Sequence, residues 1–270
     1  MAGKADVSGE DLRLGAAILM SCLIALLACS GGGGGATKGP LTGNWEITLQ
    51  RHGLPQPATY TGFLIQNGSS ITGSVILGDA CSGVGSVTGT VNGQNLTLDI
   101  NEFGQDVSLI GSIPAGSGPI GGQFSTPAGA CTAFNTSTGT WSAVPVPPLN
   151  GNFTGVFSST ADNGPPPVNV TGTVTQGPNT GASNATLSGT ITATSAASSF
   201  CSYLTTATIT GTISGEVVTL NLYGPDGALI SQISAATITP DGTSLTGEYT
   251  FQQISKSCLG DQGTLQLTFQ

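Results

Sequence analysis

The chain has 270 residues and a net charge of −9, and only 7% of its residues are Asp, Glu, Lys or Arg, where soluble domains carry roughly 25%. Five Lys and Arg residues are too few for the basic surface that nucleic-acid binding requires. The abundance of Gly (42) and Pro (15) excludes a coiled coil or helical bundle. Hydrophobic residues make up 38% of the chain and the mean hydropathy is positive, so we expect a packed core and not disorder.

The N-terminal residues have the form of an export signal. Residues 14–28 are an uncharged apolar run of fifteen residues. A membrane-spanning helix needs roughly 20 apolar residues, whereas the apolar part of a signal peptide needs about 7 to 15. We therefore predict a signal peptide over residues 1–28; the alternative is a buried core helix.

The apolar run ends at Leu26-Leu27-Ala28-Cys29, which resembles the lipobox of bacterial lipoproteins. The resemblance implies cleavage before Cys29 and attachment of lipid, including an acyl chain such as palmitate, to that cysteine. Ser30 stands where Asp would signal retention in the inner membrane, so the resemblance implies an outer-membrane lipoprotein, periplasmic or surface-exposed. The Gly-rich residues 29–40 then form a flexible tether, and the membrane is the predicted partner.

The rest of the chain contains two copies of one unit, residues 41–143 and 149–270, separated by a Pro-rich linker at 144–148. Both copies repeat a short pattern with Gly at its centre, Thr or Ser on either side of the Gly, and an apolar residue at each end. Residues 87–91 and 209–213 are examples. This period of two predicts strands with Thr and Ser on one face, and apolar residues and Gly on the other. Turn signals between the strings predict about eight antiparallel strands per copy. Residues 95–98 match 218–221 less closely than the other strings match.

Glycine recurs on the predicted apolar face of these strands. It either lets the sheet curve and close or makes room for an aromatic ring, with Trp45 and Phe153 as candidates. Both explanations favour an all-β fold of two tandem antiparallel eight-stranded meander barrels. The alternative is a pair of immunoglobulin-like β-sandwiches. The inward glycines are Gly62, Gly73, Gly89 and Gly122 in the first copy, and Gly172, Gly189, Gly211 and Gly247 in the second.

Gly43-Asn44-Trp45 on the first predicted strand resembles the G-x-W motif at the start of calycins, the lipocalin superfamily. The resemblance implies an up-and-down barrel with an apolar cavity. It assigns no ligand-binding residue, and these remain unknown. The second copy has Phe153 in place of the tryptophan.

Cys81, Cys131, Cys201 and Cys258 remain in the exported chain, and an even number of cysteines there indicates disulfides. Four cysteines allow three pairings. The repeat aligns Cys81 with Cys201 and Cys131 with Cys258, which selects Cys81–Cys131 and Cys201–Cys258. Each would close a loop of roughly 50 residues, worth about 4 kcal/mol in the chain-entropy description. There is no C-x-x-C motif, so we expect no metal site.

Residues suited to catalysis are few. His52 is the only imidazole and is predicted to lie in a surface loop, with no marked nucleophile for it to activate. Residues 99–106 superficially match a calcium loop, but Phe103 occupies a ligand position, so we interpret them as a solvated hairpin. The strand pattern supplies no inward pair of carboxylates for a glycosidase. We expect that the protein is not an enzyme and has no cofactor or catalytic residue.

These observations predict a lipid-anchored cell-envelope protein that binds, without catalysis, a small apolar ligand or a surface partner. The alternative is a purely structural or adhesive envelope protein. A continuous apolar void of several hundred Å³ would favour ligand carriage, and filled barrels would favour a role for the outer surface.

Overall fold

The computed structural model describes residues 40–78, 83–115, 119–129, 136–179, 184–194, 201–254 and 258–270. The predicted signal peptide, the lipidation residue Cys29, Cys81 and Cys131 lie outside the described residues. All described residues belong to one compact unit, Lys38–Gln270.

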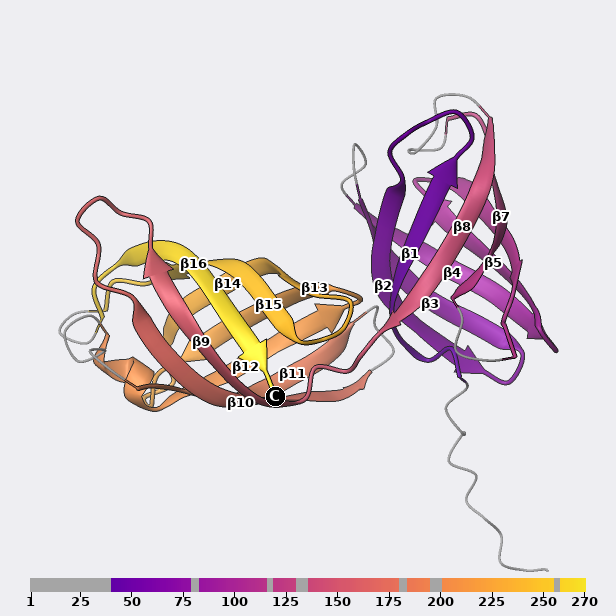
Figure 1. The fold of residues 1–270 in the computed structure, drawn as a ribbon. Helices are drawn as coiled ribbons and strands as arrows, with labels where there is room; N and C mark the ends of the chain where they lie inside the picture. Colours follow the sequence, from indigo (N-terminus) through magenta and orange to yellow (C-terminus); the bar gives the residue numbers. More distant parts are fainter. Residues whose placement is uncertain are drawn as a thin grey trace, which may run out of the picture. The chain divides into compact units, whose positions relative to one another are not determined.

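The first copy of the repeat forms a closed antiparallel barrel, here called barrel 1, in which each strand pairs with the next and β8 pairs with β1 (Figure 1). Its strands are β1 (Gly43–Arg51), β2 (Ala58–Asn67), β3 (Ser70–Leu77), β4 (Gly83–Asn92), β5 (Asn95–Glu102), β6 (Gln105–Ser112), β7 (Ile120–Thr126) and β8 (Ser137–Val146).

The second copy forms another closed eight-stranded barrel, barrel 2, in which β16 pairs with β9. A short 3-10 helix, η1 (Ser202–Thr205), precedes its fourth strand. The strands are β9 (Gly151–Ser159), β10 (Val168–Asn179), β11 (Ala185–Ala193), β12 (Ala207–Ser214), β13 (Val217–Tyr223), β14 (Leu229–Ile238), β15 (Ser244–Phe251) and β16 (Asp261–Phe269).

The predicted fold of two tandem eight-stranded meander barrels is confirmed, and the β-sandwich alternative is wrong. The predicted linker, residues 144–148, differs in part. Val144 and Pro145 pair with Glu46 and Trp45, so the first three residues of the linker belong to β8. These residues are needed to close barrel 1 against the start of β1.

Buried and exposed residues alternate along the strands, as the period of two predicts. In β4, Val87 is buried while Thr88 and Thr90 are exposed. The inward glycines lie directly opposite inward apolar residues, as Gly89 lies opposite Ile71 and Leu98. In an antiparallel pair, opposite residues point to the same face, so the predicted face of these glycines is confirmed.

Close approach of neighbouring strands explains the glycines. A Cβ at Gly89 would overlap the backbone carbonyl of Thr97 and lie 2.6 Å from the Leu98 side chain. Room for a ring is a second reason at Gly172, where a Cβ would overlap the Phe153 ring. At Gly62, opposite Trp45, the nearest atoms belong instead to Ser74 and Val75.

Side chains fill both barrels. The buried apolar residues have exposed fractions between 0% and 7%, and many in each barrel are at 0%. A water-filled channel would leave exposed surface on the side chains that border it, so no such channel runs past the inward residues that are 0% exposed. In barrel 2, Phe157, Tyr249 and Phe251 pack edge to face, with ring centroids 5.0 to 5.2 Å apart.

The strand order and register of the two barrels correspond strand for strand, with one change in the sequence match. Gly89 pairs with Leu98 in barrel 1, and the equivalent Gly211 pairs with Leu220 in barrel 2. Leu98 therefore corresponds to Leu220 and not to Asn221. The sequence match of residues 95–98 to 218–221 is therefore displaced by one residue. Both segments alternate apolar and polar residues, so an alignment shifted by one residue still has the pattern of a strand.

Candidate functional site

A buried polar motif closes the end of barrel 1 where β1 begins, which we call its proximal end. Leu41 is buried there, and its backbone N–H donates to Oε1 of Gln66 on β2 at 3.1 Å. The backbone N–H of Gln66 donates to Oγ1 of Thr42 at 2.9 Å. Trp45, the tryptophan of the G-x-W motif, donates its indole N–H to the carbonyl of Leu41 at 2.9 Å. These three hydrogen bonds therefore hold Leu41 and Thr42 at the proximal end of barrel 1.

Barrel 2 repeats this motif at the start of β9. The backbone N–H of Leu149 donates to Oε1 of Gln176 at 3.0 Å, and the backbone N–H of Gln176 donates to Oδ1 of Asn150 at 2.7 Å. Phe153 has no indole N–H, and it packs edge to face with Phe269 instead. No local pattern in the sequence distinguishes Gln66 or Gln176 from the other polar residues of these strands.

The opposite, distal end of barrel 1 contains a buried carboxylate that contradicts the predicted solvated hairpin in part. Phe103 and Gly104 form the predicted turn, and the side-chain amide of Asn101 donates a hydrogen bond to the carboxylate of Asp106 at 2.7 Å. Glu102, however, is 0% exposed and accepts a hydrogen bond from the hydroxyl of Tyr60 on β2. Glu102 has the same parity as the inward residues of β5, so its side chain points inward.

The distal end of barrel 2 also has an inward carboxylate. Asp261 at the start of β16 accepts hydrogen bonds from Tyr249 at 2.6 Å and from Ser159 at 2.7 Å. Burial, then the hydrogen bond and the charge of Asp261, raise the pKa of Tyr249 above its ordinary value. Tyr249 therefore stays a neutral donor, and Asp261, which accepts from Tyr249 and Ser159, joins β9, β15 and β16.

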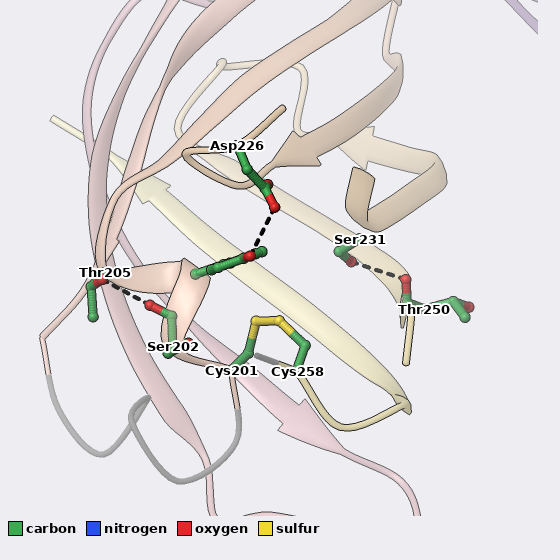
Figure 2. The surroundings of a disulfide bond; sticks show 8 residues. Cys201, Ser202, Thr205, Asp226, Ser231, Thr250 and Cys258 are labelled. Atoms are coloured by element: carbon green, nitrogen blue, oxygen red, sulfur yellow. Dashed lines mark hydrogen bonds between the residues drawn. A yellow bond between two sulfur atoms is a disulfide. The ribbon is translucent and has the colours of Figure 1, made fainter. Parts of the chain in front are cut away.

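The predicted Cys201–Cys258 disulfide is present at this end of barrel 2 (Figure 2). It joins the residue before η1 to the segment that leads into β16. Leu204 of η1 is fully buried. Tyr203 donates to Asp226 at 2.8 Å, and hydrogen bonds from the Ala228 N–H and then from Tyr203 lower the pKa of Asp226. The disulfide and η1 together cover this barrel end.

His52 is exposed in the turn after β1, where the sequence predicted a surface loop. Within the described ranges, no three His, Cys, Asp or Glu side chains gather as a metal site would require. No helix in the described part of the chain has the length and apolar character to cross a membrane.

Two hollows lie on the outer wall of barrel 2 and are bordered mainly by uncharged polar side chains. One, of about 510 Å³, lies over β9, β10 and β16. The other, of about 270 Å³, lies over β14–β16 beside a bulge at which Ala235 has a φ of 53°. The first is bordered by Thr154, Asn169, Thr171, Thr194, Gln266 and Thr268, among others.

No family model and no curated protein matches the chain. Two tandem eight-stranded meander barrels fit the binding fold of calycins.

Proposed function

We propose that this chain is a lipid-anchored cell-envelope protein whose barrels bind a surface partner through their outer walls and loops, without catalysis. The observation that supports this most directly is the packing of the barrel interiors. Inward side chains such as Ile47, Ile100 and Val107 in barrel 1, and Ile213 and Leu265 in barrel 2, are 0% exposed. A carrier of a small apolar ligand would need an apolar cavity of several hundred Å³ at this place.

The outer wall favours a partner that is polar and neutral. Rows of Thr and Ser face each other across strands, as Thr173 and Thr190 do, with their hydroxyls 3.2 Å apart. Hydroxyl groups both donate and accept hydrogen bonds. Arg51 is the one Lys or Arg residue in the described part of the chain, so this surface has little means of pairing with an anionic partner.

The anchoring part of the proposal rests on the lipobox-like Leu26-Leu27-Ala28-Cys29 and the Gly-rich segment behind it. A diacylglycerol together with an N-linked acyl chain holds a protein stably at a bilayer, whereas a single chain holds it only marginally. Residues 29–40 would then separate barrel 1 from the membrane.

Native mass spectrometry of the mature protein, purified with its own membrane lipids, tests the proposal. We expect the mass of the lipidated chain with no further apolar molecule bound in stoichiometric amount. One apolar molecule per barrel, retained after detergent exchange, would contradict the proposal and support ligand carriage.

A structural or adhesive role is the second candidate, and the repeated Thr rows on the outer walls favour it. A photo-crosslinking residue in place of Thr171, in the larger hollow, distinguishes the two in intact cells. Crosslinks to a different molecule support partner binding, and crosslinks only between copies of this chain support the adhesive role.

A further inference from the structure

The larger hollow on the outer wall of barrel 2 has an apolar floor between two amide side chains. Val156 on β9 borders this hollow and lies opposite Asn169 on β10 and opposite Gln266 on β16. Opposite residues of an antiparallel pair point to the same face of the sheet, so one row across three strands places an isopropyl group between two carboxamides. The next row carries three hydroxyl groups, those of Thr154, Thr171 and Thr268.

The smaller hollow has a carboxylate between two hydroxyl groups. Glu248 on β15 lies opposite Ser234 on β14 and opposite Thr264 on β16, and all three border the hollow. The bulge in β14 turns both Ser234 and Ala235 outward, and the φ of 53° at Ala235 lies in the left-handed region that side-chain-bearing residues rarely adopt. Bulges re-aim side chains, and this one aims a hydroxyl group at the hollow.

The strand β16 connects the two hollows. Its exposed residues alternate between amide and hydroxyl side chains, and we call them the β16 track: Gln262, Thr264, Gln266 and Thr268. The first two border the smaller hollow and the last two border the larger one. At roughly 3.4 Å per residue, the track is about 20 Å long. One elongated polar ligand can therefore reach both hollows.

The same wall of barrel 1 lacks these features, although the strands correspond. In β8, the positions of the track hold Thr138, Thr140, Ser142 and Val144. Ile110 and Gln123 stand opposite each other where barrel 2 has Ser234 and Glu248, and the ladder between β6 and β7 has no bulge. A barrel of this kind thus closes without the amides, the carboxylate or the bulge, so closure does not explain them.

We propose that the β16 track and its two hollows bind an extended, uncharged glycan; this rests on the proposed binding through the outer walls. Amide and carboxylate groups pair with the hydroxyl groups of a sugar as acceptors, and the amides also donate. Val156 offers an apolar contact for the C–H face of a sugar ring. The described part of barrel 2 has no Lys or Arg, and Glu248 would repel an anionic glycan.

Affinity should depend on the length of the glycan. The hollows measure about 270 Å³ and 510 Å³, at or below the middle of the roughly 300 to 1,000 Å³ of small-molecule sites, so each accommodates a short piece of a glycan. A monosaccharide can occupy one hollow only. An oligosaccharide that occupies one hollow reaches the second without a further bimolecular step, and this raises its affinity.

A titration of the full-length protein in detergent micelles, followed by the NMR signals of the glycan, tests the proposal. The neutral probes are cellohexaose, maltohexaose and mannohexaose, with glucose and mannose as their monomers and hexagalacturonate as the anionic probe. We expect at least one neutral hexasaccharide to bind about tenfold or more tightly than its monomer and than hexagalacturonate. Absence of binding by all three neutral hexasaccharides at millimolar concentration would overturn the proposal.

Variants locate the binding on β16. Gln262→Ala and Gln266→Ala, both at exposed positions, should each weaken binding about fivefold, as the loss of one hydrogen bond would. Ser142→Ala, at the corresponding position of β8 in barrel 1, is the matched control and should bind like the parent. Unchanged binding by the double variant would overturn the proposal. Crosslinks from Thr171 to a partner protein, without glycan binding, would overturn it as well and leave the proposed function standing.

An apolar molecule inside a barrel would instead contradict the proposed function and leave this titration unaffected.

Discussion

The side chain of Gln66 accepts a hydrogen bond from the backbone N–H of Leu41, 25 residues earlier in the chain, and this bond is buried. The same bond joins Gln176 to Leu149 at the start of barrel 2. In both copies a glutamine on the second strand therefore fixes the residue that leads into the first strand. The repetition indicates that the bond is a feature of the repeating unit.

Replacing Gln66 by Ala should destabilise barrel 1. The change leaves the buried N–H of Leu41 without a partner and also removes the bond from Gln66 to the carbonyl of Gly68. An unsatisfied buried donor costs about 1 to 3 kcal/mol. Thermal unfolding followed by circular dichroism should show a lower midpoint for this variant. Gln123→Ala, at an exposed position of β7, is the matched control and should melt like the parent.

Replacing Gly89 by Val should lower the melting temperature although valine is the better strand former. The gain in strand propensity is at most about 1 kcal/mol, whereas overpacking a filled interior costs roughly 1 to 3 kcal/mol. The overlap of a Cβ with the Thr97 carbonyl places the cost at the upper end. Thr90→Val, on the exposed face of the same strand, should stay within about 0.5 kcal/mol of the parent. A Gly89→Val variant that melts at or above the parent would contradict this account.

The disulfide prediction for the first copy remains to be tested, since Cys81 and Cys131 lie outside the described residues. The Cys201–Cys258 bond in barrel 2 supports the equivalent pairing of Cys81 with Cys131. We expect non-reducing peptide mapping to recover both pairs within their own copies. A peptide that joins Cys81 to Cys201, or Cys131 to Cys258, would show that the repeat does not determine the pairing.

Replacing Cys29 by Ala should abolish lipid attachment. We expect the variant either to leave the membrane fraction or to accumulate as the unprocessed chain, because the acyl chains are the proposed anchor. Membrane fractionation with mass determination of the N-terminal peptide measures both outcomes. Unchanged processing and an unchanged membrane fraction would contradict the lipobox assignment.

Period-two patterning was sufficient to predict the strands, the two barrels and the face on which the glycines lie. These features depend on local alternation and on short turns, which are readable residue by residue. The inward position of Glu102 was also readable, because it follows Leu96, Leu98 and Ile100 at intervals of two. The local context favours the opposite orientation, because a charged residue beside a turn is usually solvated.

Other features depend on approach between distant segments. The roles of Gln66 and Gln176 follow from which backbone N–H groups lie opposite their side chains after the barrel has closed. This relationship has no periodic pattern in the sequence.

Closure has a further consequence for a chain that carries two similar sets of strands. An open sheet exposes unpaired N–H and C=O groups at its edges, where a strand of similar sequence can pair. A repeated sequence places such strands next to each other at high local concentration, which favours exchange between the copies. The pairing of β1 with β8 and of β9 with β16 leaves neither barrel an edge strand at which the other copy could add. Each copy therefore becomes resistant to strand exchange as soon as its own last strand has paired.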